Sequence, residues 1–98
     1  MNCALESRSQ LFFRLCSDHL SIEAIPRSKM TIDFVRVRES LTARYDLAMW
    51  TPQFVVLKSR LGEEITVRKD GRMVIRNAKS EENARSVGTQ VLTLLMDL

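Results

Sequence analysis

Histidine, cysteine and glycine are scarce in this chain, and their scarcity removes several classes of function. The only histidine, His19, has no second histidine with which to share a metal ion, and no metal-ligand cluster is present. The spacing of Cys3 and Cys16 matches no zinc or redox motif. The three glycines do not form a phosphate-binding loop. The sequence therefore predicts no metal, no cofactor and no small-molecule substrate.

Acidic residues are not arranged for general acid–base catalysis either. Glu63-Glu64 and Glu81-Glu82 are adjacent pairs in a predicted turn and at a predicted helix start, so neither pair presents two facing carboxylates. A lone histidine is more often an ordinary surface or core residue than a catalytic base. We therefore expect a protein that is not an enzyme.

Long apolar runs are also missing. No stretch reaches the roughly 20 apolar residues of a membrane helix, and residues 1–29 lack the apolar segment and cleavage site of a signal peptide. The two cysteines are expected to be reduced thiols, so we expect a cytoplasmic protein. The net charge of +3 permits DNA, RNA or an acidic protein as a partner without requiring one.

The 98 residues are enough for one domain, and the chain changes character near Met30. Two interpretations of residues 1–29 stay open. In one, a helix runs from about Leu5 to Leu20 and a short strand over Ile22–Ile25 is stopped by Pro26. In the other, residues 1–29 are a loosely held or disordered extension, and the folded domain comprises residues 30–98.

Residues 31–98 carry the clearest secondary-structure patterns. Apolar residues at helical spacing predict one helix from an N-cap at Thr31 to about Ala43, and a second helix after an N-cap at Ser80. Between the helices, alternating or β-branched runs predict four strands, and Asp70-Gly71 is a strong hairpin turn. These strands are expected over Tyr45–Trp50, Phe54–Ser59, Glu64–Arg68 and Arg72–Asn77.

This order predicts a two-layer α+β domain, with a four-stranded antiparallel sheet and two main helices packed on one face. Because side chains alternate along a strand, one sheet face should pack against the helices. That set is Val55, Leu57, Ile65, Val67, Met73 and Ile75. Gly88 should allow the second helix to lie close to the sheet.

The stretch from Gly71 to Arg85, which contains Ala78-Lys79-Ser80-Glu81-Glu82, resembles the strand-to-helix junction of one repeat of the TATA-box-binding protein family. The likeness covers about residues 31–98, and it implies that family's two-layer fold. The residues that line the DNA minor groove in the family are mostly replaced here, for example by Arg76-Asn77 in place of its Thr-Gly. The chain also holds one repeat where the family uses two. The resemblance therefore implies the fold, whereas these departures from the family pattern argue against sequence-specific promoter binding.

The sheet face opposite the helices is the predicted interaction surface, because it combines apolar and basic side chains. Its candidate residues are Trp50, Phe54, Val56, Lys58, Arg68, Arg72, Val74 and Arg76. The first hypothesis is a small binding module that uses this face to form a homodimer or to bind another protein. The alternative is DNA or RNA binding, with arginines on phosphates and an aromatic ring on a base. A weaker alternative is an accessory subunit of an enzyme complex.

Overall fold

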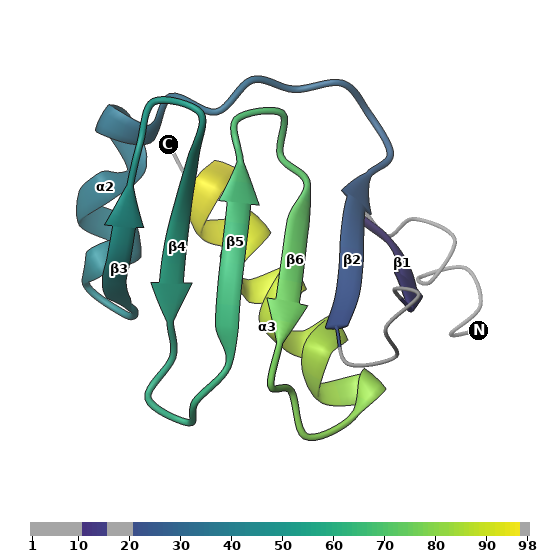
Figure 1. The fold of residues 1–98 in the computed structure, drawn as a ribbon. Helices are drawn as coiled ribbons and strands as arrows, with labels where there is room; N and C mark the ends of the chain where they lie inside the picture. Colours follow the sequence, from purple (N-terminus) through teal and green to yellow (C-terminus); the bar gives the residue numbers. More distant parts are fainter. Residues whose placement is uncertain (1–10, 16–20, 97–98) are drawn as a thin grey trace.

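The computed structural model describes residues 11–15 and 21–96, in which a six-stranded antiparallel sheet carries two helices on one face (Figure 1). The strands are β1 Leu11–Leu15, β2 Ser21–Pro26, β3 Asp46–Trp50, β4 Phe54–Lys58, β5 Glu64–Arg68 and β6 Met73–Arg76. The helices are α2 Phe34–Thr42 and α3 Glu81–Met96. The order across the sheet is β1-β2-β6-β5-β4-β3. The predicted α+β class and antiparallel sheet are confirmed, whereas the predicted number of four strands is wrong.

The two additional strands come from the segment before Met30. The helix predicted over Leu5–Leu20 is wrong where the structure describes that segment, because Leu11–Leu15 is a strand. The rest of that prediction lies outside the described residues. Phe13 of β1 is opposite Ala24 of β2, and β2 in turn pairs with β6. A strand partner and a period of two therefore outweigh the weak helical spacing. The short strand predicted over Ile22–Ile25 is confirmed as part of β2, although β2 includes Pro26 rather than stopping before it.

Residues 27–33 link β2 to α2 and cross the end of the sheet beside the β5–β6 turn (Figure 1). The backbone N–H of Ile32 donates to the carbonyl oxygen of Lys69 at 2.8 Å, and the Ile32 side chain is buried. This tie holds the chain extended past Thr31, so the predicted N-cap at Thr31 is wrong. Asp33 is the N-cap, and its Oδ1 accepts from the backbone N–H of Arg36.

The core lies between the sheet and the helices. The six strand residues predicted to face the helices are all buried, none more than 1% exposed. They pack with the apolar stripes of both helices, which are Phe34, Val37 and Leu41 of α2 and Ala84, Val87, Val91, Leu92 and Leu95 of α3. At Gly88 of α3, an added Cβ would lie 3.0 Å from a ring atom of Phe13 and 3.2 Å from Cδ1 of Ile75. Gly88 therefore allows α3 to lie close to β1 and β6. This agrees with the prediction that Gly88 lets the second helix approach the sheet.

The start of α3 follows the predicted capping pattern. The Ser80 hydroxyl accepts from the backbone N–H of Asn83 at 3.0 Å, and the Asn83 side chain accepts from the backbone N–H of Lys79 at 3.1 Å. This reciprocal arrangement satisfies two N–H groups at the helix start. Glu81 and Glu82 lie in the first turn, where the helix dipole favours negative charge.

Candidate interaction surface

The face of the sheet turned away from α2 and α3, here called the outer face, is covered by no other helix or strand of the described chain. Figure 1 looks onto this face, with the helices behind the strands. Seven of the predicted surface residues lie on the outer face. Six of them alternate along their strands with the buried residues that face the helices, and Arg72 directly precedes one of those buried residues. The seven are Phe54, Val56, Lys58, Arg68, Arg72, Val74 and Arg76.

Trp50 is the predicted surface residue that the structure places elsewhere. The pairing of β3 with β4 shifts between Leu47 and Met49, which brings Trp50 opposite buried Val55 on the helix side. There the Trp50 ring packs edge to face on Phe34, with ring centroids 5.8 Å apart. The Arg38 guanidinium lies 4.7 Å from the centre of the Trp50 ring. Trp50 therefore joins α2 to the sheet rather than contributing to the outer face.

Strand pairing arranges the outer face in rows that cross the sheet. The central row takes one residue from each strand, in the order Arg14, Glu23, Val74, Thr66, Val56 and Met49. Arg14 and Glu23 form an ion pair at 2.9 Å. Val74, Thr66 and Val56 are half-buried, and Met49 is 51% exposed. The central row therefore presents an apolar strip over β3–β6 that the described residues leave uncovered.

A second row on the outer face alternates in charge. Across β6, β5, β4 and β3 it reads Arg76, Glu64, Lys58 and Asp46. Cross-strand neighbours of opposite charge stabilise a sheet modestly. No ion pair is found for these four side chains among residues 11–15 and 21–96. Their charged groups therefore remain available to a partner.

The third row of the outer face combines an aromatic ring with two arginines. Phe54 is opposite Arg68, and the Arg68 backbone N–H donates to the carbonyl oxygen of Arg72. Asp70, in the adjacent turn, lies 3.2 Å from the Arg68 guanidinium and 3.9 Å from that of Arg72. With the other two rows, the face carries five cationic side chains and four carboxylates, a net charge of +1. They are Arg14, Lys58, Arg68, Arg72 and Arg76 against Glu23, Asp46, Glu64 and Asp70.

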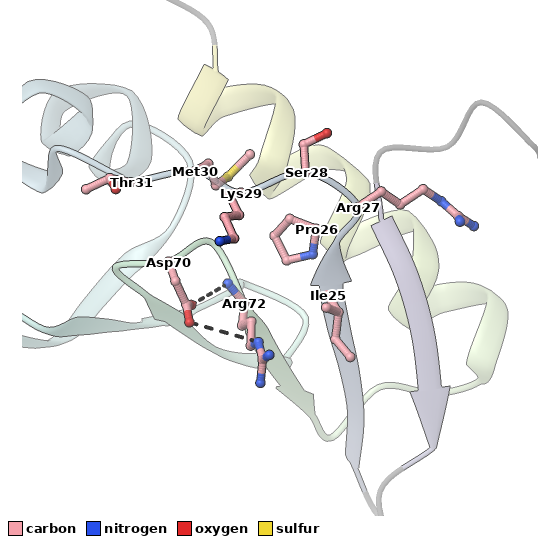
Figure 2. Close-up of a pocket in the computed structure, with 9 residues that line it drawn as sticks. All are labelled: Ile25, Pro26, Arg27, Ser28, Lys29, Met30, Thr31, Asp70 and Arg72. Atoms are coloured by element: carbon pink, nitrogen blue, oxygen red, sulfur yellow. Dashed lines mark hydrogen bonds and ion pairs between the residues drawn. The ribbon is translucent and has the colours of Figure 1, made fainter.

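A hollow of about 730 Å³ opens where residues 25–31 pass the β5–β6 turn (Figure 2). Lys29 points toward the turn, whereas the Arg27 side chain extends away from it. Asp70 also lines the hollow and is held there by the backbone N–H of Arg72 at 3.0 Å. Arg72 also lines the hollow, and its guanidinium lies 3.9 Å from the Asp70 carboxylate.

The only charged residue buried in the described part of the chain, Glu63, lies in the β4–β5 turn. Its Oε1 accepts from the Ser59 hydroxyl, and its backbone N–H donates to the same Ser59 oxygen. Glu63 also lines an adjoining hollow, and its Oε2 is buried with no hydrogen-bond partner among the described residues.

Tyr45 lies near the same turn, and its hydroxyl donates to Gln90 at 3.0 Å. Burial raises the pKa of Tyr45, the negative charge of Glu63 raises it further, and Arg44 opposes the shift. The hydrogen bonds between Ser59 and Glu63 stabilise the turn. The sequence analysis did not predict this role of Glu63. The pattern that could have indicated it is Ser59, four residues before Glu63, in a turn that contains Gly62.

A metal site and a membrane-spanning helix each set requirements for the described residues. Within residues 11–15 and 21–96, no group of three or more His, Cys, Asp or Glu residues is placed to hold a metal ion. None of the described helices combines the length and apolar character needed to cross a membrane. Cys3, Cys16 and His19 lie outside the described residues. Comparisons of the chain with protein-family models, curated proteins and solved structures found no match.

Proposed function

We propose that this chain is a cytoplasmic, non-catalytic assembly module that associates with a second copy of itself through the outer face. The observation that carries this proposal is the central row, where Val74, Val56 and Met49 form an apolar strip between two charged rows. An apolar centre with a polar rim is the usual composition of a protein–protein interface. Phe12 adds a further aromatic side chain, 49% exposed, where β1 pairs with Ile25 of β2.

The charge of the face favours a protein over a nucleic acid. A phosphate backbone requires a surplus of Lys and Arg, and the outer face has a net charge of only +1. Nucleic-acid binding remains the second candidate, because Arg68 and Arg72 lie beside Phe54, which offers a ring for a base to stack on. The two candidates differ in their response to salt, since phosphate contacts weaken steeply as salt rises.

The test is the molecular mass in solution, measured by light scattering over a range of concentrations. We expect the wild type to exceed the monomer mass at high concentration, and Met49→Lys to remain a monomer. Met49 is half-exposed, so this substitution leaves the core intact. Val35→Lys is the matched control, because Val35 is 81% exposed on α2, away from the sheet. A wild-type monomer at every concentration, with salt-sensitive binding of DNA or RNA lost on Arg68→Ala, would replace the proposal with the second candidate.

We also infer that residues 31–98 are a diverged relative of the TATA-box-binding protein repeat. The support is the shared order of a helix, four strands and a second helix, together with the junction from Gly71 to Arg85. The resemblance covers residues 31–98 only, so β1 and β2 have no counterpart in it. A crystal structure whose β3–β6 and helices superpose poorly on that repeat would contradict the relationship.

A further inference from the structure

We propose a specific geometry for the association: two copies pack outer face to outer face about a two-fold axis that runs along the strands between β4 and β5. This inference rests on the proposed self-association and adds the register. Such an axis places β5 of one copy over β4 of the other, and β6 over β3. The order of the sheet, β6-β5-β4-β3, makes this arrangement symmetric about the β4–β5 gap.

The charged row is complementary to itself under this rotation. Reversing the order Arg76, Glu64, Lys58, Asp46 brings Arg76 over the partner's Asp46, and Glu64 over the partner's Lys58. Because each contact occurs twice in a two-fold dimer, four opposite-charge pairs form in total. If this face bound an apolar surface instead, the alternating charges of the row would not contribute to the binding energy.

The other two rows agree with the same register. In the central row, Thr66 lies over the partner's Val56, and Val74 over the partner's Met49. In the third row, Arg68 lies over the partner's Phe54, where a guanidinium stacks favourably on an aromatic face. All three rows therefore pair compatible side chains at one position of the axis.

The neighbouring position of the axis is disfavoured by charge. An axis between β5 and β6, at the centre of the six strands, would bring Arg72 over the partner's Arg68. It would also bring Glu23 over the partner's Val56, which places a carboxylate on an apolar side chain. The β5–β6 axis also brings Arg76 over the partner's Glu64, so it has two attractive pairs, whereas the β4–β5 axis has four and opposes no like charges. The charge pattern therefore favours the β4–β5 axis over the geometric centre of the sheet.

Sheet twist is compatible with the register. Sheets packed face to face align at about 30° because each is twisted, so the axis tilts by about half of that angle. Arg76 and Asp46 lie about 7 Å from the axis, at one and a half strand spacings. The tilt shifts this outer pair by about 4 Å along the strands, a distance that a long side chain such as arginine spans. Four strands of about five residues give a contact of only about 300 Å² of flat sheet, so the dimer is expected to be weak.

Asp46 and Arg76 provide the decisive experiment, because they are three strands apart in one copy and opposite each other in the dimer. Asp46→Arg and Arg76→Asp each replace two attractive contacts with two repulsive ones. We expect each variant alone to dimerise at least about tenfold more weakly than the wild type. Mixed in equal amounts, they form a heterodimer in which both contacts are again attractive. Within a single copy, Asp46→Arg places an arginine beside Lys58, and Arg76→Asp places an aspartate beside Glu64. Neither variant gains an attractive contact inside the monomer, so dimer formation in the mixture cannot come from a more stable monomer.

The measurement is sedimentation at low salt and high protein concentration, on each variant and on their mixture. Recovery of the dimer in the mixture supports the register. A wild-type dimer with single variants that also dimerise, or with a mixture that stays monomeric, overturns the register and leaves the proposed function standing. A wild type that is monomeric throughout overturns the proposed function itself.

Discussion

Gly71→Ala tests how tightly residues 27–33 are held against the β5–β6 turn. Gly71 has a φ of +90°, which an L side chain rarely adopts. An added Cβ would also lie 2.5 Å from Sδ of Met30 and 2.9 Å from Cγ of Pro26. Gly62 is the matched control, because its φ is +105° and a Cβ there would meet nothing within 4 Å. The pair therefore separates backbone strain from the crowding by the linker.

Backbone strain at either glycine costs about 1–2 kcal/mol of unfolding free energy, and the lower entropy of the unfolded alanine variant offsets about 0.4–1 kcal/mol of it. Gly62→Ala is therefore expected to destabilise by about 1 kcal/mol. At Gly71, overpacking adds about 1–3 kcal/mol, which gives a total of about 2–4 kcal/mol. In a Met30→Ala background, part of the crowding disappears, so the cost of Gly71→Ala should fall by roughly 1 kcal/mol.

The assay is urea unfolding followed by the fluorescence of Trp50, the single tryptophan, which packs between α2 and the sheet. A difference of about 2 kcal/mol between the two glycine variants shifts the midpoint by about 1 M urea. Equal costs at Gly62 and Gly71, or a Gly71→Ala cost unaffected by Met30→Ala, would refute the contact between the linker and the turn.

Three further perturbations test the helix–sheet contacts and the turn cluster. Gly88→Val should lower the unfolding free energy, measured by urea unfolding, by about 1–3 kcal/mol through overpacking. Phe13→Ala should relieve part of that loss because the Phe13 ring lies beside Gly88. Ser59→Ala should cost about 1–3 kcal/mol because it leaves Glu63 Oε1 and two backbone N–H groups without their partner, measured by urea unfolding against an unchanged Ser86→Ala control. The raised pKa of Tyr45 stabilises the fold below the ordinary value of about 10 and is lost as the pH rises through the raised value, so the stability advantage of wild type over Tyr45→Phe should shrink in alkaline urea titrations; a constant advantage would contradict the shift.

The elements between Thr31 and Leu98 were predictable because local chemistry specifies them. Asp70-Gly71 marks the β5–β6 turn, Ser80 begins α3, and the alternation within β5 separates buried Ile65 and Val67 from the outer face. These features depend on residues a few positions apart, so the sequence contains them directly.

The remaining features depend on contacts between distant segments. Leu11–Leu15 becomes a strand because β2 offers it a pairing edge, which no local pattern reveals. Trp50 turns to the helix side because β3 contains an irregularity next to Met49, and one extra residue reverses every later side chain. The same irregularity brings Met49 onto the outer face. The apolar strip of the central row therefore depends on the strand register, which the sequence alone does not give. Predicting the row would have required the position of that bulge.

Methyl NMR of the full chain over a range of concentrations tests self-association through the outer face most directly. Val55 and Val56 are neighbours in β4 with opposite orientations, the first fully buried and the second on the outer face. We predict that the methyl signals of Val56 and Val74 shift as the concentration rises, while those of Val55 and Val67 stay in place. Methyl signals that do not respond to concentration, or a shift confined to exposed Val35 on α2, would contradict the outer face as the assembly surface.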